Sequence, residues 1–156
     1  MAANDYVFVT RWRVDGTPER VYRLLEKTDD YPRWWRRVWL TVDRIAEGDA
    51  NGVGRRSKLL TQGWLPYRLR WESETVKKVF PSKIAIQATG DFVGSGVRTI
   101  EPDGPFTNVA YDWRLRADKP VIRALSFLVK PLFRWNHNWA MARGREGLEA
   151  ELKAKR

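Results

Sequence analysis

The stretch TPERVYRLL, residues 17–25, carries the clearest structural signal in the sequence. Thr17 is a favourable N-cap, and Pro18 suits the first position of a helix, where its missing N–H costs no hydrogen bond. Apolar side chains then recur at the spacing of a helix. The stretch therefore predicts a helix that begins after Thr17 and ends near residue 28.

The segments on both sides of this helix extend the prediction. Residues 5–14 are rich in β-branched and aromatic side chains and end at Asp15-Gly16, which indicates a first strand followed by a turn. After the helix, Asp29-Asp30 precedes a second short helix predicted over residues 31–37. That helix contains the bulky pair Trp34-Trp35.

The middle of the chain has the pattern of an antiparallel meander. Short β-rich stretches alternate with turn residues such as Gly, Pro, Asn and Asp. We take Gly63 as a bend or bulge and Gly94-Ser95-Gly96 as a hairpin turn. The predicted strands cover residues 38–47, 55–62, 65–80, 83–90, 96–101 and 107–116.

The C-terminal part is predicted to be helical. A helical segment opens near Asp118-Lys119-Pro120, and Pro131 is expected to kink or restart it. A long helix then runs from about residue 132 to 153, with apolar residues on two faces. One face is expected to pack on the sheet. The fold class is thus α+β, in which a curved antiparallel sheet grips a long helix.

Length and composition fit one domain over residues 1–156. A chain of 156 residues can bury a core without covalent staples. Nine tryptophans are more than such a core requires, and large rings at this density often line a cavity or an interface. The absence of cysteine excludes disulfides and thiolate chemistry.

The charge balance leaves two interpretations of the surface. A net charge of +10 is typical of proteins that attract nucleic acid, an anionic membrane or an anionic ligand. Because the charges are spread along the chain, we favour a solvated basic surface. Nucleic acid is not an expected partner, and membrane contact is a less favoured alternative. The N-terminus lacks the pattern of a signal peptide, so we expect a cytoplasmic protein, either monomeric or homodimeric.

Four motifs, in this order, resemble the START-like, helix-grip superfamily (SRPBCC), and its bacterial polyketide-cyclase/dehydrase branch in particular. They are TPERVYRLL at residues 17–25, DYPRWW at 30–35, NGVG at 51–54 and GREGLEAEL at 144–152. The resemblance covers essentially the whole chain. It implies a fold with a cavity between the sheet and the C-terminal helix, but it implies no particular reaction, because the superfamily includes carriers, sensors and enzymes.

We therefore predict a cavity that binds a small hydrophobic molecule of aromatic, polyketide-like or lipid-like character. Strand periodicity places apolar side chains on its wall and most charged ones in water. Arg98 is included as an inward cation that could face a ligand carboxylate or phenolate. The alternative is that the rings simply fill the core. The predicted ligand-binding residues are Trp34, Trp35, Tyr67, Trp71, Arg98, Trp113, Phe133 and Met141.

His137 is the single histidine, and it is the candidate catalytic residue. In an enzyme it would act as general acid or base on a phenol or enol, in a cofactor-independent cyclase or dehydratase. The simpler interpretation is a partly buried helix histidine bonded to a neighbour. One histidine without cysteine or a carboxylate cluster predicts no metal site, and no motif indicates a cofactor.

Overall fold

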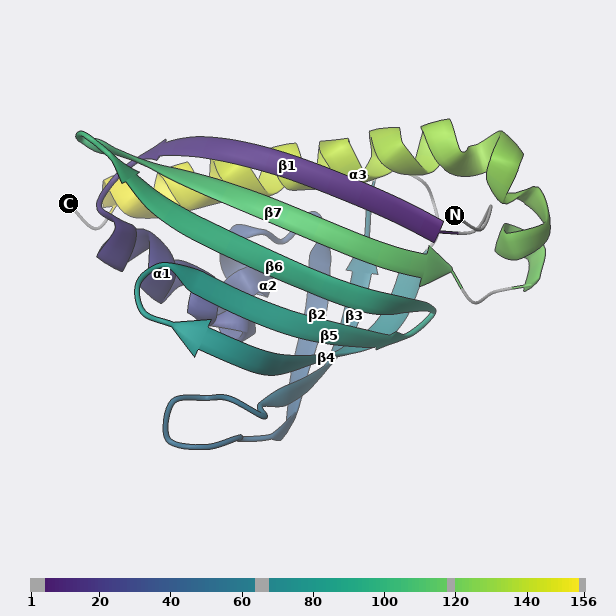
Figure 1. Ribbon diagram of the computed structural model, residues 1–156, viewed down its shortest axis with the longest axis horizontal. Helices are drawn as coiled ribbons and strands as arrows, with labels where there is room; N and C mark the ends of the chain where they lie inside the picture. The colour runs from purple at the N-terminus through teal and green to yellow at the C-terminus, as the bar shows by residue number, and fades with distance from the viewer. Residues whose placement is uncertain (1–4, 64–67, 118–119, 155–156) are drawn as a thin grey trace.

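The computed structural model describes residues 5–63, 68–117 and 120–154, and their side chains except those of 5, 6, 92, 117 and 120–133. Within these residues, seven strands, three α-helices and one 3-10 helix follow each other along the chain (Figure 1). In chain order they are β1 (Asp5–Asp15), α1 (Pro18–Glu26), η1 (Thr28–Asp30), α2 (Tyr31–Trp34), β2 (Trp39–Ala46), β3 (Arg56–Gln62), β4 (Arg68–Val79), β5 (Lys83–Gly90), β6 (Phe92–Asp103), β7 (Phe106–Ala117) and α3 (Pro120–Ala154).

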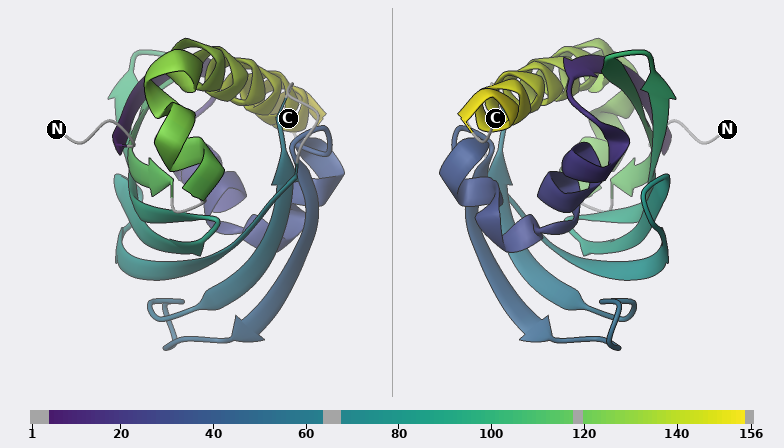
Figure 2. Two further views of the ribbon diagram at one scale, coloured as in Figure 1. Left: turned by 90° about the vertical axis from the view of Figure 1, so that its right-hand side faces the viewer. Right: turned by 90° about the vertical axis from the view of Figure 1, so that its left-hand side faces the viewer.

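The strands form one antiparallel sheet in the order β1-β7-β6-β5-β4-β3-β2. Every neighbouring pair except β1 with β7 is consecutive in the chain, as predicted for a meander. The sheet curls strongly, and α3 runs along its concave side (Figures 1 and 2). The helices α1 and α2 cover one end of the curl, and the first turns of α3 lie at the other end (Figure 2). This arrangement confirms the predicted helix-grip architecture.

Local signals explain the start of α1 well and its end less well. The Thr17 hydroxyl accepts a hydrogen bond from the Arg20 backbone N–H at 3.3 Å, as expected for an N-cap. The helix ends at Glu26, two residues earlier than predicted. The second helix is also shorter than the predicted 31–37, because the chain after Trp35 turns into β2 through bonds from Val38 N and Trp39 N to Trp35 O.

The predicted turn at Gly94-Ser95-Gly96 is wrong, because all three residues lie inside β6. The hairpin turn instead falls at Gly90, whose φ of +122° favours glycine. Gly96 has a packing role, since a Cβ there would lie 2.9 Å from Cζ3 of Trp113, its partner on β7. A glycine in a strand can thus mark a ring on the neighbouring strand rather than a turn.

The helix α3 is longer than predicted. It begins at Pro120, where the sequence predicted that a helical segment opens, and continues as one helix through Pro131, so the alternative of a restart at that proline is wrong. Figure 1 shows the helix bending within its first turns, before it crosses the sheet. None of the helices within the described residues combines the length and the apolar character that crossing a bilayer requires.

Candidate functional site

Alternating side chains give the sheet an apolar inner face beneath α3. On β7, Val109, Tyr111 and Trp113 are buried, whereas Asp112 and Arg114 point outward. The alternation predicted from the sequence is confirmed here, because charged side chains remain in water while rings face the interior. The inner face therefore supplies the wall on which the candidate site is built.

Four tryptophans form a continuous chain of ring contacts across the interior. Ring centroids are 5.7 Å apart from Trp35 to Trp39, 5.7 Å from Trp39 to Trp71, and 6.1 Å from Trp71 to Trp113. Such tilted and edge-on contacts favour aromatic pairs beyond the area they bury. Three of these rings are predicted site residues. Trp39 was not predicted, because its role depends on ring neighbours that are distant in sequence.

The predicted pair Trp34 and Trp35 packs against two glycines of α3. The Trp35 indole N–H donates to Ala140 O at 2.9 Å. A Cβ on Gly144 would lie 2.4 Å from Cε2 of Trp35, and a Cβ on Gly147 would lie 2.0 Å from Trp34 O. Since real atoms do not approach this closely, the glycines allow α2 to contact the α3 backbone directly.

Arg98 lies inside the molecule, as predicted for an inward cation, and is 5% exposed. Its guanidinium carbon is 5.6 Å from the ring centroid of Tyr31 and 5.2 Å from that of Tyr111. Its Nη1 donates to Leu25 O at 3.3 Å. Burial lowers the pKa of Arg98, but the neighbouring Tyr31 and Tyr111 raise it by more, so the pKa lies above its ordinary value and the group is a permanent cation. Among the described residues, no carboxylate lies within ion-pair distance.

Polar atoms without a hydrogen-bond partner lie beside this cation. The register pairs Thr10 with Tyr111 and Tyr111 with Arg98, which gives three inward polar side chains on neighbouring strands. The Thr10 and Tyr111 hydroxyls are both inaccessible and have no hydrogen-bond partner. Burial raises the pKa of Tyr111 far above its ordinary value, so its hydroxyl keeps its proton and can donate.

His137 lies on α3 facing β1, where its ring stacks on Phe8 with centroids 4.3 Å apart. Its Nε2 is inaccessible and has no hydrogen-bond partner. Burial lowers the pKa of His137 to about 4, so the imidazole is neutral at neutral pH. It can donate or accept a hydrogen bond there, but it is a weak base.

The remaining predicted site residues have different outcomes. Met141, Trp71 and Trp113 are buried in the same apolar cluster, and Trp34 packs against it. Tyr67 and the side chain of Phe133 lie outside the described part of the chain. Tyr111 was missed as a polar member of the site. Strand alternation placed Tyr111 inward, but nothing in the sequence showed that it would lie beside Arg98.

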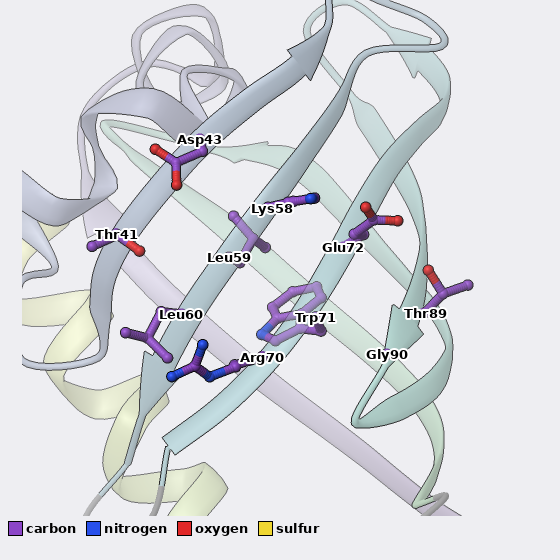
Figure 3. Close-up of a pocket in the computed structure, with 10 residues that line it drawn as sticks. All are labelled: Thr41, Asp43, Lys58, Leu59, Leu60, Arg70, Trp71, Glu72, Thr89 and Gly90. Atoms are coloured by element: carbon purple, nitrogen blue, oxygen red, sulfur yellow. The ribbon is translucent and has the colours of Figure 1, made fainter.

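A surface depression of about 460 Å³ lies over β2 to β5 (Figure 3). Its lining includes the outward charged side chains Asp43, Lys58 and Glu72, and it differs from the predicted apolar cavity in position and chemistry. One predicted site residue, Trp71, reaches it. The full lining is Thr41, Asp43, Lys58, Leu59, Leu60, Arg70, Trp71, Glu72, Thr89 and Gly90. Within the described residues, no cluster of three metal-ligating side chains occurs.

Comparison with known proteins identifies the fold. No protein-family model matches this sequence, and no curated protein is similar to it in sequence. Solved structures are similar in fold. A protein from Thermus thermophilus is 21% identical, covers 94% of this chain and 99% of its own, and has a TM-score of 0.76. A START superfamily protein from Mycobacterium smegmatis is 15% identical, with coverage of 96% and 99% and a TM-score of 0.78.

An enzyme of known class shares the same architecture. The Zhui aromatase/cyclase from a Streptomyces species is 12% identical, covers 96% of this chain and 94% of its own, and has a TM-score of 0.72. At these identities the likeness establishes the fold alone. The chain thus has the START-like helix-grip fold that its sequence motifs indicated.

Proposed function

We propose that this protein binds a small hydrophobic molecule between the concave face of the sheet and α3, as a carrier or a sensor. The observation that carries the proposal is the set of buried polar atoms without a partner on an otherwise aromatic wall. These atoms include Tyr111 Oη and His137 Nε2. Buried polar groups are normally hydrogen-bonded, so such atoms on an inner wall are well suited to a bound ligand.

A row of small residues on the inner face of the sheet is the proposed position of the apolar part of this ligand. Ser57, Ser73, Ala88 and Gly94 are direct partners across four neighbouring strands and form one row of small side chains on the inner face. Large side chains fill the adjacent rows, as at Trp71. We propose that the apolar body of the ligand lies against this row, because small side chains take up less of the space beneath α3 than the large side chains of the adjacent rows.

An enzyme using the same site is the second candidate, and the buried Nε2 of His137 favours it. Its pKa of about 4 makes it a poor match for proton abstraction at neutral pH, where an effective base has a pKa near the working pH. A hydrogen-bonding role toward the ligand therefore suits His137 better. If His137→Ala abolished turnover of an aromatic polyketide while ligand affinity stayed intact, the enzyme would be favoured instead.

The binding proposal is tested with N-phenyl-1-naphthylamine, a neutral hydrophobic fluorophore. We expect saturable binding to the purified protein. Ser73→Leu should weaken this binding about tenfold, or about 1.4 kcal/mol, because the leucine side chain would occupy the space beside the row of small residues. The matched control is Glu72→Leu, which puts the same side chain on the outer face of β4.

The two variants also distinguish binding in the interior from binding in the outer depression. If Glu72→Leu changes affinity while Ser73→Leu does not, the fluorophore binds the outer depression and the proposal fails. Native mass spectrometry of the freshly purified protein adds an independent measurement. A retained apolar molecule that is lost from Ser73→Leu supports the proposal.

A further inference from the structure

We infer that the ligand carries an acidic head group, a carboxylate or phenolate, which Arg98 and Tyr111 bind at the end of the interior beneath α1 and α2. This inference rests on the proposed function and adds the chemical class of the ligand. A buried cation is costly unless it is paired, and no carboxylate among the described residues pairs with this one.

Arg98 also has a structural contact, with the C-terminal end of α1. Leu25 O is one of the last carbonyls of α1, and a cation at a helix C-terminus is favourable. However, the Tyr31 hydroxyl already donates to the same oxygen at 2.5 Å, and the Arg98 contact is longer, at 3.3 Å. A guanidinium has five N–H donors, so capping this helix uses one of them.

Tyr111 supplies the second group. It is the cross-strand partner of Arg98, it is 1% exposed, and its hydroxyl has no hydrogen-bond partner. Since the phenol keeps its proton, it can donate to an oxygen held by the guanidinium. A carboxylate or phenolate oxygen would accept from both groups, and hydrogen bonds to a charged acceptor are stronger than neutral ones. Thr10, the partner of Tyr111 on β1, offers a further hydroxyl donor, since its Oγ1 has no hydrogen-bond partner.

The geometry of β6 allows the head group and an apolar body to fit together. Arg98 lies four positions along β6 from Gly94, which belongs to the row of small side chains. At about 3.3 Å per residue, this distance is about 13 Å, the scale of a two-ring molecule with one substituent. Between them, the Trp113 ring lies over Gly96 and offers a surface for stacking.

The inference is tested with two probes of similar shape, 2-naphthoate and 2-ethylnaphthalene, which differ in the acidic group. We expect the intact protein to bind 2-naphthoate at least tenfold more tightly. Tyr111→Phe should reduce this preference about tenfold, because it removes one bond to the charged head group and keeps the ring. The melting temperature of Tyr111→Phe should stay the same or rise, since the lost hydroxyl has no partner in the free protein.

Tyr31→Phe is the matched control, because it changes the other phenol beside Arg98. Its hydroxyl is already bonded to Leu25 O, so we expect a lower melting temperature and an unchanged preference for 2-naphthoate. Equal affinity for the two probes, or an unchanged preference in Tyr111→Phe, would overturn the inference. If N-phenyl-1-naphthylamine binds normally in that case, the proposed function stands and the acidic head group alone is refuted.

Discussion

Replacing Gly147 by alanine tests how α2 is held on α3. Helix propensity alone favours alanine over glycine by about 1 kcal/mol. The new Cβ would lie 2.0 Å from Trp34 O, a backbone atom that moves only if α2 moves. Overpacking of this kind costs about 1–3 kcal/mol, and a displaced α2 would also lose the bond from the Trp35 indole to Ala140 O, worth about 1 kcal/mol.

The net expectation is a loss of about 1–3 kcal/mol in the free energy of unfolding. For a chain of this size, this loss corresponds to a melting temperature lower by roughly 3–10 °C. Urea and thermal unfolding, followed by tryptophan fluorescence, measure both quantities. Ala142→Gly, at an exposed position of the same helix, calibrates the propensity effect. A more stable Gly147→Ala would refute the direct contact between Trp34 O and α3.

Three further predictions concern single groups. Thr17→Ala should lower the free energy of unfolding by about 1 kcal/mol, because the N-cap bond to Arg20 N is lost; an unchanged urea midpoint would contradict it. As pH falls from 6.5 toward 4, the unfolded chain binds a proton at His137 that the folded chain does not. Stability should therefore fall by up to about 3 kcal/mol across this window, and His137→Gln should show a shallower pH dependence. Trp35→Phe should cost about 2–4 kcal/mol through its lost bond to Ala140 O and the space left by a smaller ring, as measured by calorimetry.

Local signals were sufficient where a single segment determines the structure. The start of α1 follows from Thr17 and Pro18, and strand alternation places Tyr111 and Trp113 inward, because both patterns act over a few residues. The turn predicted at residues 94–96 failed for the opposite reason. The glycine at 96 accommodates a ring on β7, and this requirement is visible only when the two strands are paired.

The candidate site shows the same division. An inward Arg98 could be predicted from its strand, but its contact with the end of α1 joins residues far apart in the chain. Likewise, Trp39 completes a ring chain between α2 and β4 that no short pattern encodes. The candidate site residues come from several helices and strands, so their types are readable from the sequence while their spatial neighbours are not.

The pairing of β1 with β7 has a consequence for how the chain reaches its native state. Asp15 of β1 pairs with Phe106 of β7. Even these partners, the closest in sequence between the two strands, are about 90 positions apart. Closing so large a loop is entropically costly, and proteins dominated by distant contacts fold slowly. During synthesis, β1 emerges from the ribosome long before β7, the strand it pairs with, exists. The strand β1 is thus made well before β7 and is among the last elements of the sheet to be secured.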